Sequence, residues 1–173
     1  MPAEREADEV LCRRAAGGDR GAFRLLVEIH ERRLRAFLAQ LGGADLGDEL
    51  AQEAFLKAWQ SLPGFRGEAK FSSWLFAIGW RLFADHRRRQ RSEEVKREAA
   101  GRLAESVEAP NAGERLDLAR ALARLEPVER AALVLCDGHG WSHGEAAEIL
   151  RIPLGTLKAT VRRAKHKCRE HLR

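Results

Sequence analysis

The last 16 residues of the chain carry the densest positive charge in the sequence. Seven Lys or Arg residues and one acid, Glu170, fall between Lys158 and Arg173. Apolar residues recur in this stretch at intervals of three and four positions, which predicts a helix with one apolar stripe and basic remaining faces; they are Leu157, Val161, Ala164, Cys168 and Leu172. Cationic side chains on such a helix bind phosphates, and the helix fits the major groove of duplex DNA, about 12 Å wide.

A second helix is expected directly before this one. Ser142 is followed three residues later by Glu145, the spacing of a capping box at the start of a helix. The chain then turns at residues 151–153, and two helices across such a short turn, the second of them basic, form a helix-turn-helix. The first residues of the second helix then face base edges and later ones meet phosphates. The candidates for bases are Thr156, Lys158, Ala159, Thr160 and Arg162, and those for phosphates are Arg163, Lys165 and Lys167.

One set of residues has a spacing that could bind a metal ion. Cys136, His139 and His143 form C-x2-H-x3-H, which offers three ligands of the kind that zinc prefers. No fourth ligand is evident, and the two glycines at 138 and 140 equally explain the stretch as a break between helices. We expect no metal and no cofactor, and whether the three residues have a sensing role stays open.

Catalytic chemistry finds little support in the sequence. It has no Gly-rich phosphate-binding loop, no paired carboxylates in an apolar setting and no His–Cys pair with an orienting acid. Asp85 and His86 are adjacent along a basic helix, and adjacent residues do not share a helix face. We therefore do not expect an enzyme.

Composition favours a helical protein of the cytoplasm. The 173 residues are 33% charged and 45% hydrophobic, with Tyr absent and Ala, Leu, Arg and Glu abundant. Three widely spaced cysteines (Cys12, Cys136 and Cys168) imply no disulfide framework. The acidic N-terminus has no apolar core and does not resemble a secretory signal, and the longest apolar run, "WLFAIGW", is too short to span a bilayer. We expect an all-α protein with no membrane insertion.

Helical periodicity divides the chain into two parts. In the first part we expect helices over about residues 4–16, from a cap at Asp19 to Gly42, from a cap at Asp45 to before Pro63, and from Ser72 to the arginine block at 87–91. The pattern fades between about residues 91 and 113, resumes at Leu116, and continues in a helix that has Pro127 in its first turn and ends near Cys136. The expected domains are residues 1–91 and 114–173, joined by a flexible linker at 92–113.

Charge also separates along the chain. Residues 44–53, "ADLGDELAQE", contain four acids and no base, whereas residues 87–91, "RRRQR", are basic like the C-terminus. An acidic patch beside basic segments indicates two kinds of partner, one of which is a polyanion.

Two motif sets resemble the extracytoplasmic-function (ECF) sigma factors of bacterial RNA polymerase. The C-terminal "WSHGEAAEILRIPLGTLKATVRRAKHKCREHL" resembles the promoter-reading domain of that family. The N-terminal domain of the family has an acidic D-L-x-Q-E-x-F-x-x-x-W helix, an F-R-G-E loop and an F-x-x-W-L-x-x-I helix that ends in D-x-x-R-R. The matching residues are Asp48, Leu50, Gln52, Glu53, Phe55 and Trp59, then 65–68, then Phe71, Trp74, Leu75, Ile78, Asp85, Arg88 and Arg89.

The chain departs from the family pattern at three places. Ile78-Gly79-Trp80-Arg81 stands where the family has I-A-R-N, and Lys158-Ala159-Thr160 stands where it has K-S-R. Arg151 replaces the Gly that usually follows the first helix of the pair, at a cost of about 1 kcal/mol if the residue is left-handed. Both promoter elements are therefore expected to differ from those usual in the family.

The resemblance implies a fold, a function and three sets of contacts. The fold is a sigma region 2 bundle followed by a sigma region 4 helix-turn-helix, and the function is to bind core RNA polymerase and direct it to promoters. The clamp helices of the largest polymerase subunit would receive Asp48, Glu49, Leu50, Gln52, Glu53 and Phe55. The melted −10 strand would meet Phe65, Arg66, Lys70, Trp74, Trp80, Arg81, Arg87 and Arg88, and the duplex −35 element would meet the C-terminal helix.

Trp80 enters this set for a reason of its own. It lies six positions after Trp74, so it is expected away from the main apolar stripe and beside arginines, where an indole ring stacks on a base. For Phe65 and Trp74, a place in the core between helices is an equally good interpretation.

Two other functions remain in view. A free-standing helix-turn-helix regulator that binds operator DNA as a dimer explains the C-terminus but leaves the acidic helix without a role. Such a regulator binds duplex DNA alone, whereas a sigma factor does so with core polymerase. The paired domains could also serve mainly as the target of an anti-sigma factor, a partner that we expect in either case.

Overall fold

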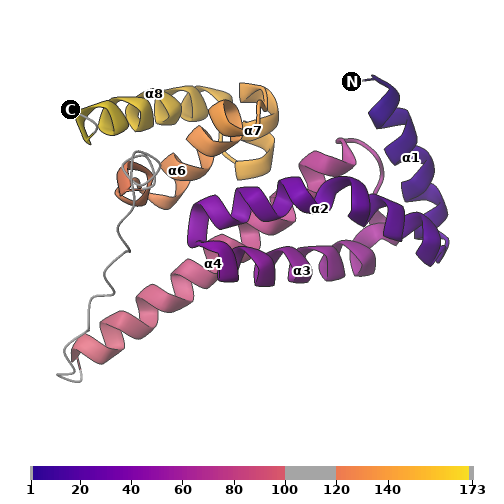
Figure 1. The fold of residues 1–173 in the computed structure, drawn as a ribbon, viewed down its shortest axis with the longest axis horizontal. Helices are drawn as coiled ribbons and strands as arrows, with labels where there is room; N and C mark the ends of the chain where they lie inside the picture. The colour runs from indigo at the N-terminus through magenta and orange to yellow at the C-terminus, as the bar shows by residue number, and fades with distance from the viewer. Residues whose placement is uncertain (1, 100–119, 172–173) are drawn as a thin grey trace.

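The computed structural model describes the backbone of residues 2–99 and 120–171 and the side chains of residues 7–98 and 120–171 (Figure 1). The first part contains helices α1 (Pro2–Ala16), α2 (Arg20–Gly42), α3 (Ala44–Ser61) and α4 (Phe71–Ala99), with a 3-10 turn at Leu62–Gly64. The second part contains α6 (Pro127–Leu133), a π-helical segment (Val134–Gly138), α7 (His143–Leu150) and α8 (Leu154–His171). No strand occurs in these ranges, and the prediction of an all-α fold is confirmed.

Helices α2 and α3 run side by side because the chain reverses with almost no loop. Gly43, with φ of 90°, both ends α2 and precedes α3, a backbone conformation that favours glycine. Gly47 then lets the two helices approach closely, since a Cβ there would lie 2.6 Å from the backbone nitrogen of Ala39. The Asp19 side chain caps α2 as expected, by accepting from the Ala22 N–H at 3.0 Å. The predicted cap at Asp45 is wrong, because Asp45 lies inside the first turn of α3.

Helix α4 is longer than the sequence pattern predicts. It begins at Phe71 rather than Ser72 and continues to Ala99, eight residues beyond the end expected at Arg91. The extension buries no apolar face: Val95 is 58% exposed, and the pair Glu93–Arg97 spans one turn at 3.9 Å. Residues with a high helix propensity keep this segment helical without packing on a core. For this reason the loss of apolar periodicity after Arg91 does not mark the end of the helix. The domain boundary at 91/92 stays a prediction, and residues 100–113 of the expected linker lie outside the described ranges.

The C-terminal part has the caps that the sequence predicts. Pro127 occupies the first turn of α6, and Ser142 with Glu145 forms a capping box at the start of α7. Arg151 ends α7 in the left-handed conformation, with φ of 54° and ψ of 45°. Helix α8 then packs on α6 and on residues 120–125 before it, through one apolar cluster made of Ala121, Leu125, Leu133, Ala164 and Cys168. This arrangement is the predicted helix-turn-helix.

Candidate nucleic-acid and polymerase interfaces

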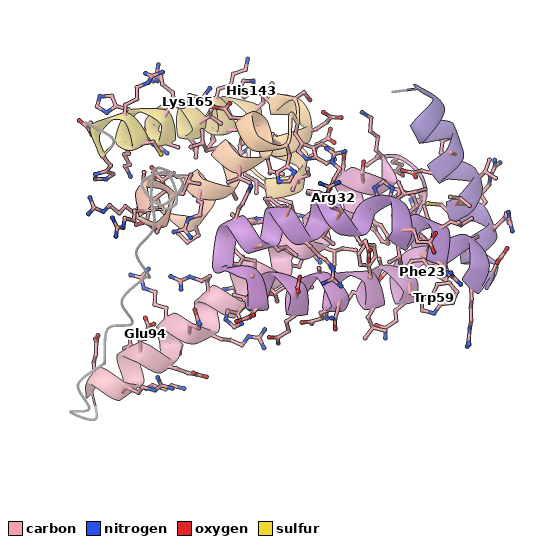
Figure 2. The ribbon with its side chains drawn as sticks, in the orientation of Figure 1. Phe23, Arg32, Trp59, Glu94, His143 and Lys165 are labelled. Carbon is pink, nitrogen blue, oxygen red and sulfur yellow. The ribbon has the colours of Figure 1, made fainter. Side chains whose placement is uncertain are left out.

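Helix α8 presents a basic face to solvent, on the side of the molecule away from α2 and α3 (Figures 1 and 2). Lys158, Arg162 and Arg169 are exposed, and within residues 7–98 and 120–171 none of them forms an ion pair. Thr156 is exposed and Ala159 is half-buried at the start of the helix. Leu154, the first residue of α8, is 45% exposed. An exposed apolar side chain at this position suits contact with a thymine methyl group, and the sequence analysis did not single it out.

Thr160 does not lie where the sequence analysis expected it. Its side chain is 2% exposed, and its hydroxyl donates to the Thr156 carbonyl oxygen at 2.8 Å. The apolar stripe of α8 is wider than its large residues alone indicate, and Thr160 falls within it beside Val161. Thr160 therefore cannot face bases in this conformation.

The expected phosphate-binding residues of α8 are paired with acids of the same domain. Lys165, labelled in Figure 2, lies 2.9 Å from the Asp137 carboxylate. Lys167 lies 2.8 Å from Glu129, and Arg163 lies 3.8 Å from the same group. These three cations thus have protein partners that Lys158 and Arg162 lack.

The loop before α4 forms an aromatic cluster. The ring centroids of Phe65 and Trp74 are 4.8 Å apart, and both rings also pack on Phe71. Phe65 and Trp74 are half-buried, so each supports the core and keeps an exposed edge. Arg66 is exposed and lies 3.9 Å from Glu68.

Along α4 the basic residues are exposed and Trp80 is half-buried. Arg81, Arg87 and Arg88 face solvent, where Arg88 pairs with Asp85 at 2.8 Å. The Trp80 ring packs against the core with its centroid 5.9 Å from that of Phe83 and is half-buried. Trp80 is thus less exposed than expected, because α4 is covered on more than one side, and its stacking on a base stays a prediction.

The acidic helix α3 offers a face that combines charge with one large apolar group. Glu49 and Gln52 are exposed, and Leu56 is 57% exposed on the same face, since residues at these spacings are neighbours on a helix. Asp48 is exposed but paired with Arg35 at 2.9 Å, and Glu53 pairs with Lys57 at 3.4 Å.

Two residues expected on this acidic face lie in the core instead. Leu50 is 2% exposed and Phe55 is 9% exposed, both packed inward. The exposure of Leu56 could have been predicted from the sequence. Leu46, Leu50 and Ala54 define the inward-facing stripe of α3, and Leu56 falls outside it.

The two parts of the chain pack against each other around Trp141. The indole is 8% exposed, its centroid lies 5.1 Å from that of Phe76 on α4, and the Arg33 guanidinium lies 5.4 Å from the ring. Arg33 also donates to the His139 carbonyl oxygen at 3.2 Å. One hydrophobic core therefore runs through both parts.

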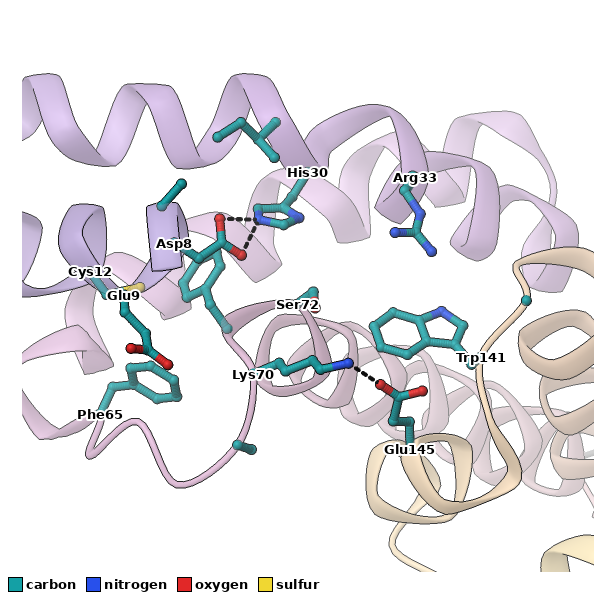
Figure 3. Close-up of a pocket in the computed structure, with 15 residues that line it drawn as sticks. Asp8, Glu9, Cys12, His30, Arg33, Phe65, Lys70, Ser72, Trp141 and Glu145 are labelled. Carbon is teal, nitrogen blue, oxygen red and sulfur yellow. Dashed lines mark hydrogen bonds and ion pairs between the residues drawn. The ribbon is translucent and has the colours of Figure 1, made fainter. Parts of the chain in front are cut away.

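A cavity of about 530 Å³ opens beside Trp141 (Figure 3). Asp8 of α1 and His30 of α2 line it as a buried pair 3.0 Å apart, and Lys70 donates to Glu145 across it at 2.6 Å. The Lys70 hydrogen bond, opposed by partial burial and aided by bonds from Ser142, lowers the pKa of Glu145 to about 2.

The spacing of Cys136, His139 and His143 does not produce a metal site in the structure. No group of three or more His, Cys, Asp or Glu side chains that could hold a metal ion occurs among the described residues. Burial, followed by the charge of Arg33, lowers the pKa of His139, and burial raises that of Cys136. No described helix is long and apolar enough to cross a membrane.

Comparison with known proteins finds a matching family model for each of the two parts of the chain. Residues 26–93 match the family model described as Sigma-70 region 2, and residues 115–168 match the one described as Sigma-70, region 4. With a basic helix-turn-helix at one end and an acidic helix in the bundle at the other, the chain belongs to the sigma-70 family of sigma factors. Within that family its relatives place it in the ECF group.

These relatives cover nearly the whole chain. It is 34% identical, over 92% of its length, to the RNA polymerase sigma factor NccH of Alcaligenes xylosoxydans xylosoxydans, of which 91% is covered. It is 36% identical, over 78% of its length, to the ECF RNA polymerase sigma factor EcfG of Rhodopseudomonas palustris, of which 76% is covered. It is 30% identical, over 94% of its length, to the ECF RNA polymerase sigma-E factor of Escherichia coli, of which 92% is covered.

Two solved structures share the fold. The sigma factor RpoE of Bartonella quintana, solved with the anti-sigma factor NepR, superposes with a TM-score of 0.73 at 30% identity, covering 87% of this chain and 96% of that one. CnrH, solved with the cytosolic domain of CnrY, superposes with a TM-score of 0.73 at 27% identity, covering 96% of this chain and 97% of that one.

Proposed function

We propose that this chain is an alternative sigma factor that binds core RNA polymerase and directs it to a particular set of promoters. The observation that carries the proposal is the division of surfaces: an unpaired basic face on α8 and, on a separate helix bundle, the acidic face of α3 with Leu56. The first suits duplex DNA and the second suits a protein partner of opposite charge. Sigma factors are not a class of enzyme, and the work of this one takes place in the cytoplasm.

Each residue proposed to contact DNA or core polymerase has a side chain that is exposed or half-buried. Lys158, Arg162 and Ala159 would read the −35 duplex, with Thr156 and Leu154 at the start of the helix. Exposed Arg66, Lys70, Arg81, Arg87 and Arg88 would hold the melted −10 strand, with the edges of Phe65 and Trp74 available for stacking. Asp48, Glu49, Gln52 and Glu53 would dock on core polymerase around Leu56.

An anti-sigma factor is the second partner that we propose. RpoE and CnrH were each solved in complex with a partner, and the partner of RpoE is named an anti-sigma factor. A free-standing regulator, by contrast, would have no use for the acidic face of α3.

Reconstituted transcription tests the proposal. The full chain is added to core polymerase from a bacterium with a library of start regions, and the transcripts are sequenced. We expect initiation from a subset that shares two elements, and only when both proteins are present. Tight binding of the chain alone to duplex DNA, without any initiation, would favour the regulator instead.

A further inference from the structure

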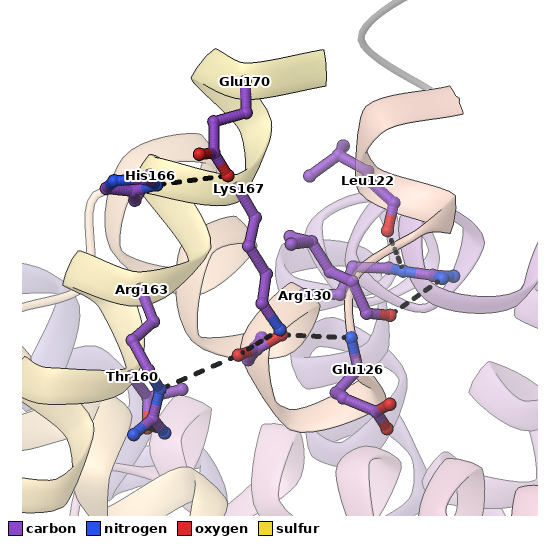
Figure 4. Close-up of polar contacts among 10 residues, drawn as sticks. Leu122, Glu126, Arg130, Thr160, Arg163, His166, Lys167 and Glu170 are labelled. Carbon is purple, nitrogen blue, oxygen red and sulfur yellow. Dashed lines mark hydrogen bonds and ion pairs between the residues drawn. The ribbon is translucent and has the colours of Figure 1, made fainter.

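Glu129 is a buried residue of α6 whose carboxylate faces α8, the helix proposed to read DNA. Its two hydrogen-bond partners, Glu126 and Lys167, are labelled in Figure 4. Glu129 is 5% exposed. Its two oxygens accept hydrogen bonds from the Lys167 ammonium group at 2.9 and 2.8 Å, and one of them also accepts the Glu126 backbone N–H at 3.2 Å. The carboxylate thus caps its own helix and binds α8 at the same time.

Glu129 lies beside an apolar interface, although the Lys167 side chain is 44% exposed. Small side chains such as Ala164 and Cys168 of α8 pack there against Leu133 of α6 and Ala121 before it. Burial, and secondly the Glu129 charge, raise the pKa of the Cys168 thiol. Apolar contacts of this kind tolerate a small rotation of one helix on the other, whereas a buried carboxylate must keep its cation. The ion pair therefore fixes the rotation of α8 about its own axis.

The basic residues of α8 divide into two sets as a result. Arg163 and Lys167 lie on the side that faces Glu129, at 3.8 and 2.8 Å. Lys158, Arg162 and Arg169 lie on exposed faces, without an ion pair within residues 7–98 and 120–171. Only the second set has its charge fully available to a phosphate.

We propose that Glu129 is a positioning residue for promoter recognition: it fixes the rotation of α8 and withholds Lys167 from the DNA backbone. This inference rests on the proposed function of α8, and it proposes an alternative to the untested expectation that Lys167 meets a phosphate. A fixed rotation directs the start of α8 at base edges, and a withheld cation removes one sequence-blind contact. Both effects favour the chosen promoter over unrelated DNA.

The salt dependence of DNA binding distinguishes this role from a purely structural one. Each additional phosphate contact steepens the slope of log affinity against log salt by about 0.9. The variant Glu129→Gln keeps an oxygen that can accept the Glu126 N–H and loses the charge that holds Lys167. We expect its slope to be steeper by about 0.9, and its preference for the promoter to fall roughly tenfold, as when one base pair is no longer read.

The measurement uses holoenzyme assembled from core polymerase and the full chain. A promoter duplex is first selected from a randomised upstream library with the unchanged chain, and binding to it and to an unrelated duplex is then followed from about 50 to 200 mM salt. Glu129→Gln with Lys167→Gln should return to the original slope. Lys167→Gln alone leaves Glu129 only Arg163, at 3.8 Å, so it should lower the free energy of unfolding, but it should leave the slope of the folded chain unchanged. Arg169→Gln is the matched control, because Arg169 is exposed on α8 and is not among the residues proposed to read bases, and it should make the slope shallower by about 0.9 if Arg169 meets a phosphate.

Two results overturn the inference: an unchanged or shallower slope for Glu129→Gln, or a slope shallower by about 0.9 for Lys167→Gln. Circular dichroism of each variant confirms that the helices are intact. If the unchanged holoenzyme selects no duplex at all, the proposed function itself fails, which is a different outcome.

Discussion

The Lys70 ammonium group lies 2.6 Å from the Glu145 carboxylate and ties the loop before α4 to the first turn of α7 (Figure 3). Glu145 also accepts the Ser142 backbone N–H at 3.0 Å and so completes the capping box that starts the helix-turn-helix. One carboxylate therefore serves both the local fold of the C-terminal part and its contact with the N-terminal part. A promoter phosphate that binds Lys70, as proposed above, has to compete with Glu145 for it.

Replacing Lys70 with Ala should destabilise the protein in a pH-dependent way. The pKa of Glu145 is lowered from 4.5 to about 2, so its ionised form stabilises the fold above about pH 4.5 and that contribution is lost as the pH falls toward 2. Because Lys70 is 45% exposed, we expect a difference of about 1 kcal/mol at pH 7. Urea unfolding across this pH range should show the difference vanish in acid. A difference independent of pH, or an equal effect of Lys57→Ala, would contradict the assignment.

Leu56 on α3 should matter to assembly with core polymerase more than Leu25, an exposed leucine on α2. Leu56→Arg places a cation in the acidic face of α3 that we propose as the docking surface, and an unfavourable charge at an interface commonly costs several kcal/mol. We expect affinity for core polymerase to fall at least about tenfold, measured by fluorescence titration. Leu25→Arg is a matched control, because Leu25 is 45% exposed on α2. Equal losses from both variants would show that the face of α3 has no special role.

Replacing Lys158 and Arg162 with Ala should reduce initiation at promoters and leave binding to core polymerase intact. Both are exposed, and neither has an ion pair in the described part of the chain, so their loss should not disturb the fold. Loss of base contacts costs about 1–3 kcal/mol for each good contact. We expect the double Ala variant to lose initiation at promoters with the upstream element, in a transcription assay with saturating chain. Loss of binding to core polymerase instead would show that the docking surface includes α8, which contradicts its assignment to α3.

Much of the fold could be predicted because its signals are local. Asp19, Ser142 with Glu145, and Pro127 act within one helical turn, and the structure has each where the sequence predicts it. The residues of the chain alone do not predict the left-handed conformation of Arg151. The conformation could be expected only because the family that the chain resembles usually has a glycine at this position. Local chemistry decides where helices start and stop more than distant contacts do.

The parts that were missed depend on contacts between distant segments. Trp80 was expected to be exposed, and it packs beside Phe83 because α4 is covered on several sides. The hydrogen bond of Lys167 to Glu129 was not predicted, because the two residues are 38 positions apart in the sequence. The packing of Trp141 on Phe76 joins two parts that the sequence shows as separate. No periodicity within one helix carries information of this kind.

Arg130 joins the two parts by hydrogen bonds to backbone carbonyls. It donates to the carbonyl oxygens of Leu41, at the end of α2, at 2.6 Å and of Ala123 at 2.7 Å. It also donates to that of Leu122 at 2.7 Å (Figure 4). Arg130→Met keeps the length of the side chain and leaves these oxygens without their donor, so we expect the free energy of unfolding to fall by about 2–4 kcal/mol. Chemical unfolding measures this loss. Arg124→Met, at an exposed position, is the control and should change little.

Arg151 should be replaceable by Gly with a gain in stability. A non-glycine residue in the left-handed conformation costs about 1–2 kcal/mol, and Arg151 has φ of 54°. Glycine removes this strain but loses about 0.5–1 kcal/mol more conformational freedom on folding, which leaves a net gain of about 0.5–1 kcal/mol. The urea midpoint should therefore rise with an unchanged slope. Arg162→Gly, inside α8, should lower the free energy of unfolding by about 1 kcal/mol and so lower the midpoint. If Arg151→Gly also lowered the midpoint, the exposed Arg151 side chain would have to contribute more than the strain at its backbone costs.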